Sequence, residues 1–276
     1  MSHFTVLVIG AKNEEEVDEI LHPFWELDLS REEMVEDKRA EFNCEISVNE
    51  LEKEFALWMN DEKNQEFIQK NNISYESPKE WVENYHEHYL NKEETHYGYY
   101  SNPKAKWDWF QIGGRWHGYW KLKEQAIGAG TVGTPSWTLE HKICSDPLKA
   151  DIVQKRDVDW QGMKEDNIEE AEKVWKEAWK KYPDYEDEKK NKENISSRCF
   201  MYDIKEGEMR EKYIERRTHF STFAVVKDGK WYEKGEMGWF GLTANEKQQD
   251  KWDREFDKLL KSLPDEEYLC LVDCHI

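Results

Sequence analysis

Unbroken apolar runs stand at both ends of the chain. Residues 3–10 read His-Phe-Thr-Val-Leu-Val-Ile-Gly, and residues 268–276 read Tyr-Leu-Cys-Leu-Val-Asp-Cys-His-Ile. Both runs are too short for a core helix, and their β-branched and aromatic content is typical of buried strands. We therefore expect one sheet that contains both termini, with the rest of the chain supplying its other strands and excursions from it.

A long polar segment, residues 11–100, follows the first strand and carries helix signals. Ser47-Val-Asn-Glu50 and Ser77-Pro-Lys-Glu80 both match a capping box, and Pro78 falls at the first helical position, where its missing N–H costs nothing. We expect two or three short helices joined by acidic loops, which form an inserted arm rather than part of the sheet. The apolar positions of the two capped helices are Leu51, Phe55, Leu57 and Trp58 in the first, and Trp81, Tyr85 and Tyr89 in the second.

The most distinctive segment is residues 105–123, where two alternating aromatic runs flank Gly113-Gly114. This composition predicts a tight hairpin with positive φ at the turn. Side chains alternate between the two faces of a strand, so each run sorts its residues by face. Trp107, Trp109 and Gln111 share a face of the first run; Trp116, Gly118 and Trp120 share a face of the second, and Arg115, His117 and Tyr119 point the other way.

The C-terminal half predicts a strand, a hairpin, a strand, a helix and the final strand. Residues 124–160 are irregular, a helix is expected from Asp166 to about Tyr182, and residues 183–197 have the composition of a charged linker. Short strand-like runs follow at 199–204 and 220–226. Lys227-Asp-Gly-Lys230 predicts a hairpin turn into Trp231 and Tyr232. A third capping box, Thr243-Ala-Asn-Glu246, predicts a helix that carries Trp252, Phe256, Leu259, Leu260 and Leu263.

These elements predict an α+β fold: a mainly antiparallel sheet with helices on one face and an inserted acidic helical arm. Residues 1–10, 101–123 and 198–276 are assigned to an aromatic α+β core. Residues 11–100 form the acidic arm, and residues 124–197 form an irregular segment, a helix and the charged linker.

Charge separates the arm from the core. The chain of 276 residues holds 60 acidic and 40 basic side chains, for a net charge of −20, and residues 11–100 alone hold 25 acidic against 9 basic. Fourteen Trp, 13 Tyr and 11 Phe indicate a folded chain, because disordered chains lack such large apolar side chains. The acidity disfavours general nucleic-acid binding, which needs clustered Lys and Arg, and it favours a basic protein partner.

Other classes are disfavoured by shorter patterns. No apolar run is long enough for a membrane span, and no signal peptide is expected. The five cysteines are scattered and odd in number, which disfavours a disulfide framework and favours reduced thiols in the cytoplasm.

Three motifs have residue types that occur in nucleotide or metal sites, but a structural interpretation fits each of them better. Gly128-Ala-Gly-Thr-Val-Gly133 matches GxGxxG, but Thr-Pro-Ser-Trp follows where a dinucleotide site needs a helix, so an ordinary loop is the better interpretation. Cys270, Cys274 and His275 have the types of metal ligands, but the two cysteines lie too far apart along a strand to share a zinc ion and suit buried core positions. His86 and His88 are expected to diverge around a helix. We therefore expect no metal, no cofactor and no catalytic residue.

The aromatic centre supplies the candidate binding residues. Asp108, Arg115 and His117 bracket the two glycines and have the types needed for acid–base chemistry, and the tryptophans have the type needed for base stacking. A structural hairpin and core packing fit the composition better, since no nucleophile motif lies nearby and the local charge is small. The candidate binding residues are Trp107, Trp109, Arg115, Trp116, His117 and Trp239.

Four further segments are distinctive: Met1-Ser-His-Phe-Thr-Val-Leu-Val-Ile-Gly10, Lys106-Trp-Asp-Trp109 with Ile112-Gly-Gly-Arg-Trp116, Phe223–Tyr232 with Gly235-Glu-Met-Gly-Trp239, and Leu271-Val-Asp-Cys-His-Ile276. Together they resemble a family of uncharacterised phage and prophage proteins. The resemblance implies a phage accessory protein of the kind that counters host defences, such as an inhibitor of the Gabija complex, and a weaker similarity points to a ferredoxin-like core. The resemblance to this family implies no active-site residues in the present sequence.

The function expected from these observations is a phage-encoded, non-enzymatic inhibitor that binds and blocks a host antiviral defence protein complex. It is expected to act in the cytoplasm of the bacterial host as a homo-oligomer, without membrane or general nucleic-acid binding. The alternative is a protein that binds or cleaves a nucleotide defence signal, with Arg115, His117 and the tryptophans lining its pocket.

Overall fold

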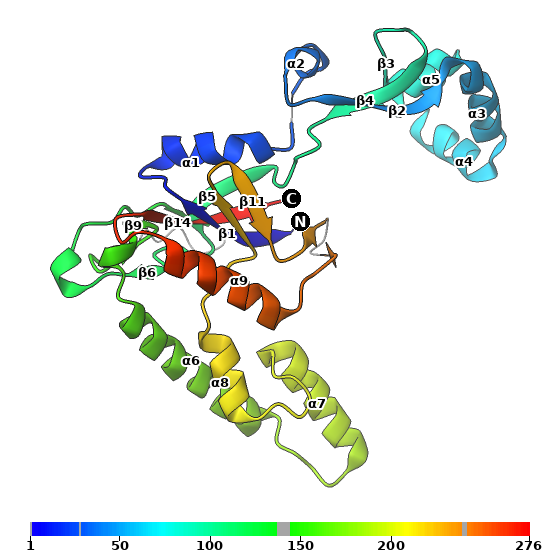
Figure 1. The fold of residues 1–276 in the computed structure, drawn as a ribbon. Coiled ribbons are helices and arrows are strands. Elements are labelled where there is room, and N and C mark those ends of the chain that lie inside the picture. The colour runs from blue at the N-terminus through cyan, green and yellow to red at the C-terminus, as the bar shows by residue number, and fades with distance from the viewer. Residues whose placement is uncertain (1, 28, 137–143, 239–241) are drawn as a thin grey trace. The chain divides into compact units, whose positions relative to one another are not determined.

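The computed structural model describes residues 2–27, 29–136, 144–238 and 242–276 (Figure 1). The chain forms two compact units. Unit 1 comprises Met1–His22 and Trp109–Ile276, and unit 2 comprises Pro23–Asp108. None of the helices among the described residues combines the length and the hydrophobicity needed to span a membrane.

Unit 1 is built on a mixed, mainly antiparallel sheet with the strand order β11-β10-β1-β14-β5-β7, in which β9 also pairs with β14. The two terminal strands lie side by side at its centre, as the apolar runs predicted, and Leu7 faces Leu271 across the pair. β10 runs parallel to β1, and β5 runs antiparallel to β14. The strands are β1 (His3–Ile9), β5 (Trp109–Gly114), β7 (Thr134–Pro135), β9 (Ile152–Gln154), β10 (Ala224–Lys227), β11 (Lys230–Glu233) and β14 (Tyr268–His275).

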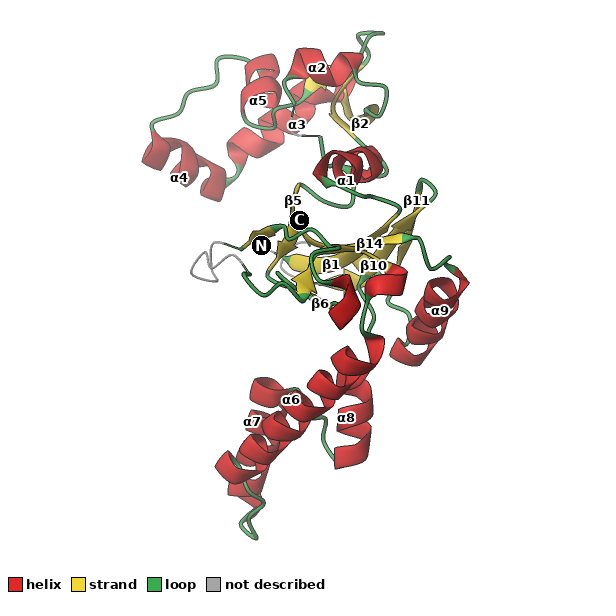
Figure 2. Ribbon diagram, turned by 90° about the vertical axis from the view of Figure 1, so that its left-hand side faces the viewer, coloured by secondary structure: helices red, strands yellow, loops and turns green. Residues whose placement is uncertain are grey.

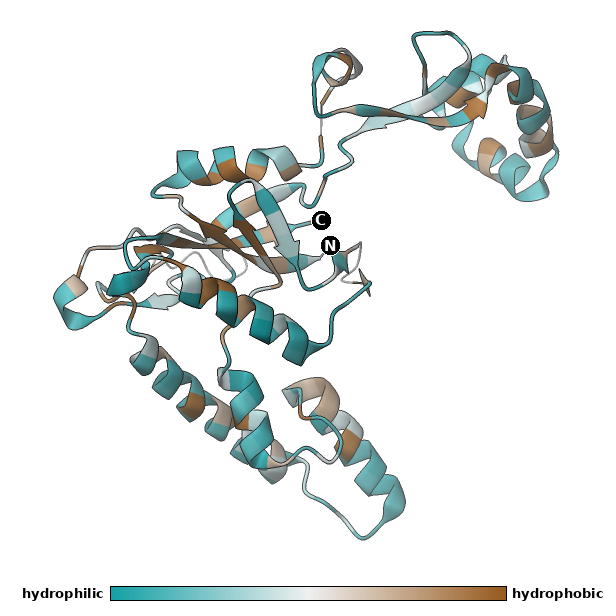
Figure 3. Cartoon of the chain, in the orientation of Figure 1, coloured by the Kyte–Doolittle hydropathy of each residue, from teal (hydrophilic) through white to brown (hydrophobic). Residues whose placement is uncertain are grey.

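Helices cover both faces of this sheet (Figures 1 and 2). On one face α9 (Gln249–Ser262) buries Trp252 and Phe256 against a core that includes Leu7 and Leu271. On the other face lies α1 (Glu14–Leu21), a helix capped by Asn13 that buries two side chains one turn apart. Because β1 and β14 are covered on both sides, they read as continuous apolar runs, which appear brown in Figure 3.

Three helices form a lobe that belongs to unit 1: α6 (Trp160–Lys181), α7 (Glu188–Tyr202) and α8 (Arg210–Thr218). The helix predicted from Asp166 begins earlier, because Asp159 accepts the Gly162 N–H and caps it. The predictions of a charged linker over 183–197 and of a strand over 199–204 are wrong, since α7 occupies most of both. Its polar and apolar residues show almost no helical periodicity, so only the Asp187 cap signals it.

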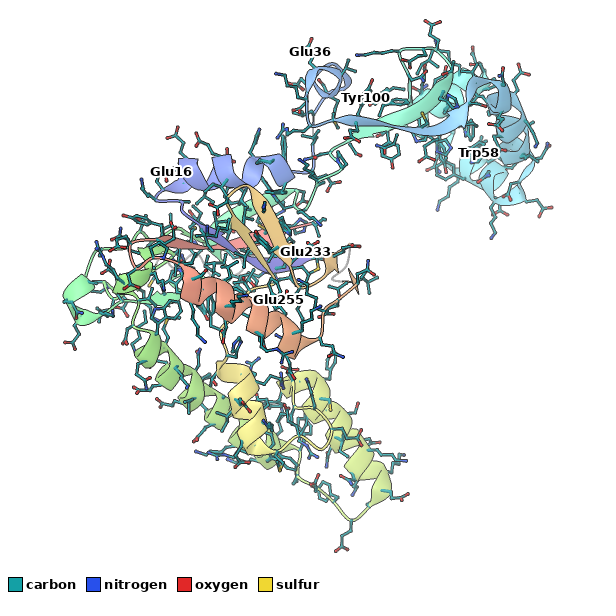
Figure 4. All side chains as sticks on the ribbon, viewed as in Figure 1. Glu16, Glu36, Trp58, Tyr100, Glu233 and Glu255 are labelled. Carbon is teal, nitrogen blue, oxygen red and sulfur yellow. The ribbon has the colours of Figure 1, made fainter. Side chains whose placement is uncertain are left out.

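Unit 2 contains a three-stranded antiparallel sheet in the order β2-β4-β3, which the helical signals did not reveal. Helices begin after the predicted caps Ser47 and Ser77, whereas Tyr89 lies in a strand and not in a helix. Trp58, on the first of these helices, packs against the hydrophobic core of unit 2 (Figure 4). The elements are α2 (Arg31–Glu36), β2 (Glu41–Ser47), α3 (Val48–Asn60), α4 (Glu62–Asn71), α5 (Pro78–Asn84), β3 (Tyr89–Leu90) and β4 (His96–Ser101).

Two predicted hairpin turns and one predicted helix start have different outcomes. The Asp228–Gly229 turn joins β10 to β11 in a hairpin, as predicted. The hairpin predicted at Gly113-Gly114 is wrong, because both glycines lie at the end of β5 and pair with β7. The helix predicted to start at Thr243 is also wrong. Residues Thr243–Ala244 form β13, which pairs with β12 (Glu236–Met237), and the helix begins later.

Candidate functional site

The structure separates the predicted site residues. Trp107 is buried in unit 2 and bridges to Trp25, whereas Trp109 opens β5 in unit 1. Arg115, Trp116 and His117 follow β5, and Trp239 lies outside the described residues. Asp108 belongs to unit 2, where its carbonyl accepts a hydrogen bond from the Trp25 indole. The acid–base set of Asp108, Arg115 and His117 is therefore divided between the two units.

A buried carboxylate, Asp151, organises the segment that contains His117. It stands between β8 (Lys149–Ala150) and β9 and is fully buried. Its Oδ1 accepts the Gly118 N–H at 2.6 Å and the Tyr119 N–H at 3.4 Å, and its Oδ2 accepts the Gly133 N–H at 2.8 Å. Backbone N–H donors of this kind replace the hydrogen bonds to water that a buried carboxylate loses. Asp151 thus ties two loops to the edge of β9.

His117 lies against this carboxylate and is almost fully buried. Its Nδ1 is 3.0 Å from Asp151 Oδ2, although the ring is not oriented for a well-aligned hydrogen bond. Its Nε2 accepts the backbone N–H of Cys144 at 2.9 Å. Because Nε2 accepts a hydrogen bond from the Cys144 N–H, the ring N–H of His117 is on Nδ1, on the side of Asp151.

Cys144, His117 and Asp151 have the residue types of a cysteine nucleophile with its base and orienting acid, and the sequence spacing did not reveal them. In such a set the imidazole must accept the thiol proton. Here the Nε2 lone pair is occupied by the Cys144 main chain, and the His117 side chain is 4% exposed. The arrangement fixes the fold of this segment and leaves the His117 imidazole without a free lone pair for a substrate or a thiol.

A second buried carboxylate, Asp273 of β14, fixes the residues that follow β5. Its Oδ1 lies 2.9 Å from His3 Nδ1, and its Oδ2 accepts the Arg115 backbone N–H at 3.0 Å. Arg115 therefore contributes its main chain to this centre. Sequence patterns could not identify Asp273, because an isolated Asp in an apolar strand gives no indication of its partners.

The two carboxylates explain the pair of glycines. A Cβ on Gly113 would lie 2.7 Å from Asp151 Cγ, and a Cβ on Gly114 would lie 2.4 Å from Asp273 Cβ. Both glycines also have positive φ, at +78° and +50°. Gly113-Gly114 is thus required for close approach to Asp151 and Asp273 in a left-handed backbone conformation and not for a hairpin turn.

An aromatic layer continues from Asp273 toward the ends of the strands. Trp109 stacks on His275 with ring centroids 5.0 Å apart, and His3 meets both rings edge-on at 5.2 and 5.1 Å. These three residues face one another in register across β5, β14 and β1. Trp109 is therefore a half-buried member of a ring cluster in unit 1.

The glycine-rich loop and the terminal cysteines have structural positions. Gly130 and Gly133 pack against Ala150 and the Ile112 carbonyl, and the loop continues as strand β7. Cys270 and Cys274 are buried in β14. Within the described residues, no group of three or more His, Cys, Asp or Glu side chains is arranged to hold a metal ion.

The predicted divergence of His86 and His88 is wrong. Helix α5 ends at Asn84, and the chain then brings the two imidazoles to a centroid distance of 5.3 Å. Burial lowers the pKa of His86, His88 lowers it further, and Glu45 opposes both effects. Both rings line a cleft of about 330 Å³, together with Glu45, Ile46, Glu50, Glu54, Trp81 and Val82.

Comparisons with protein-family models, with curated proteins and with solved structures find no match for this chain. In unit 1 the His117 side chain is buried and the Arg115 main chain binds Asp273, while the Arg115 side chain is exposed. In unit 2 an acidic cleft is open to a ligand.

Cysteine reactivity provides a test of this burial. Burial raises the pKa of the Cys270 thiol well above its ordinary value, with the nearby Asp151 carboxylate acting in the same direction, whereas Cys44 in unit 2 is exposed. The thiolate is the reactive form, so iodoacetamide at mildly alkaline pH is expected to alkylate Cys44 rapidly and Cys270 only after urea unfolding. Peptide mass spectrometry over time measures both rates, and equal rates in the native protein would refute the buried position of Cys270.

Proposed function

We propose that this protein is a non-enzymatic inhibitor that binds and blocks a host antiviral defence protein complex, and that unit 2 makes the contact. The proposal joins two supports. The resemblance to phage and prophage accessory proteins suggests the biological role, and the charge of unit 2 suggests the kind of partner surface. We also propose that the inhibitor acts as a homo-oligomer, which light scattering on the purified chain tests.

The observation that carries the proposal is the concentration of negative charge on a unit with its own core. Residues 23–108 hold 21 acidic and 10 basic side chains, a net charge of −11 in less than a third of the chain. Leu51, Trp81, Val82 and Tyr97 form a separate hydrophobic core beneath this charge. A folded acidic surface steers a basic partner toward it and selects against acidic ones.

The buried centre of unit 1 supports a non-catalytic role. A nucleotide-handling protein would use Arg115, His117 and the tryptophans around an open pocket. Instead, His117 is buried against Asp151, the Arg115 main chain bonds to Asp273, and Trp107 belongs to unit 2.

Affinity capture from a host that carries an antiviral defence system tests the proposal. The full chain is expected to recover a specific protein complex with a basic contact surface, and recovery is expected to fall steeply as salt rises from about 0.1 M to 0.5 M, because exposed charges are screened over a few ångströms at the higher concentration. A chain with an unrelated acidic domain serves as the control bait. Recovery of no specific protein, together with a thermal shift on addition of cyclic nucleotides, would contradict the proposal and favour the nucleotide alternative.

A further inference from the structure

Strand β2 is an edge strand of the sheet in unit 2. It pairs with β4 on one side, and in the described part of the chain no strand pairs with its other side. An edge of this kind offers a row of N–H and C=O groups that accept an added strand. At seven residues, from Glu41 to Ser47, β2 is long enough for such pairing.

A bulge places an acidic side chain at the middle of this edge. Cys44 pairs with Gly98 and Ile46 pairs with Tyr97, so Glu45 is the extra residue between them. Glu45 is exposed and lines the 330 Å³ cleft described above. Glu45 therefore belongs both to the edge strand β2 and to the lining of the cleft.

The cleft has the chemistry of a site for a cationic side chain. Glu50 and Glu54 stand one turn apart on α3 and add two carboxylates to that of Glu45. None of the three forms an ion pair with Lys or Arg in the described residues, although Glu50 accepts a hydrogen bond from the Ser47 hydroxyl.

An independent observation concerns Trp81, which lines the same cleft and is 5% exposed. Its indole N–H is buried and has no hydrogen-bond partner among the described residues. A buried donor without an acceptor is costly, and an acceptor on a bound ligand removes that cost. A peptide brings both the acceptor, in its carbonyl groups, and the cation.

We propose that an extended basic segment of the partner protein adds to β2 as a fourth strand and places an arginine in this cleft. The inference rests on the proposed function and specifies the partner's chemistry. Arginine fits better than lysine because its planar, forked guanidinium reaches two carboxylates at once and stacks on aromatic rings.

A fluorescent probe peptide, acetyl-Thr-Val-Thr-Arg-Thr-Val-Thr-amide, tests the proposal on the full chain. Binding by anisotropy is expected to weaken at least about tenfold in the triple variant E45Q/E50Q/E54Q, the equivalent of about 1.4 kcal/mol. The matched control, E52Q/E62Q/E66Q, removes the same charge from exposed glutamates of α3 and α4 that do not line the cleft, and it is expected to bind within about twofold of the unmodified chain. Failure of the probe to bind the unmodified chain, or equal loss in the two variants, overturns the proposal.

Strand addition has its own readout. Probe binding is expected to slow hydrogen exchange of the β2 amides and alkylation of exposed Cys44, and a probe N-methylated at alternate residues is expected to give neither effect. Unchanged exchange in β2, or equal protection by the methylated probe, refutes strand addition. Should a basic complex be captured while these tests fail, the proposed function stands and the strand-addition inference falls. Should capture fail, the proposed function falls whatever the probe does.

Discussion

Replacing Asp151 with alanine is expected to lower the free energy of unfolding of unit 1 by about 3–5 kcal/mol, since the change breaks a buried, charged network. The carboxylate is fully buried and accepts N–H groups from Gly118, Tyr119 and Gly133. Its removal leaves these donors without partners and His117 without its neighbouring charge. Urea unfolding that is monitored by hydrogen exchange of peptides from β14 measures the loss of unfolding free energy in unit 1 directly.

Two companion variants make this experiment specific. Asp265→Ala removes a carboxylate whose side chain is mostly exposed and whose contact with Lys155 is long, so a change of less than about 1 kcal/mol is expected. Asp151→Asn keeps one acceptor oxygen but places an amide N–H₂ against backbone donors. Its effect on the free energy of unfolding is expected to lie between the effects of Asp151→Ala and Asp265→Ala. An Asp151→Ala effect no larger than that of Asp265→Ala would show that the buried network does not stabilise the fold.

Substituting Gly114 with alanine is expected to destabilise unit 1 by about 2–5 kcal/mol, from a left-handed backbone that costs about 1–2 kcal/mol and a steric overlap that costs about 1–3 kcal/mol. The φ angle of Gly114 is +50°, and a Cβ there would meet Asp273 Cβ at 2.4 Å. Neither β5, which contains Gly114, nor β14 can move away easily, because β14 is buried on both faces.

Gly229 offers a matched control for this variant. It also has a positive φ, +68°, but a Cβ at that position meets nothing within 4 Å. Gly229→Ala should therefore show the backbone cost alone, about 1–2 kcal/mol. Equal destabilisation by the two substitutions, measured by the same urea and hydrogen-exchange experiment, would mean that the approach to Asp273 is unimportant.

Local patterns predicted the elements whose signals are local. The apolar runs of β1 and β14, the Asp-Gly turn after β10 and the caps at Ser47 and Ser77 each lie within a few residues of the structure they specify. The apolar spacing of α9 predicted its buried face, although the helix starts at Gln249 and not after Thr243. A hydrogen bond from Thr243 to Glu246 forms there as in a capping box, but Thr243 lies in β13, which pairs with β12.

Long-range contacts determine what the sequence did not reveal. Gly113-Gly114 has the composition of a turn, and only the carboxylates of residues 151 and 273, far away in the chain, explain it. The sequence did not reveal the strands of unit 2, because β2 is mostly polar, with three exposed and four half-buried residues, and lacks the apolar alternation that marks a strand. His86 and His88 meet because α5 ends before them, a boundary set by tertiary structure.

The aromatic centre and the acidic unit thus have different roles. In unit 1, the Trp109 ring stacks on His275, and the His117 side chain is buried with its Nε2 bonded to the Cys144 main chain. In unit 2, charge, an open strand edge and a cleft coincide at Glu45. Recognition of a basic partner by unit 2 is the central claim.

Partner capture by variants with equal charge changes in the two units tests that claim most directly. The comparison sets E45Q/E50Q/E54Q in unit 2 against E169Q/E186Q/E206Q, three exposed glutamates in the helical lobe of unit 1. The affinity of the purified partner complex for each full-length variant is measured by surface plasmon resonance. We predict a loss of about tenfold or more for the unit 2 variant and less than about twofold for the unit 1 variant. Equal losses, or a larger loss for the unit 1 variant, would contradict the assignment of partner binding to unit 2.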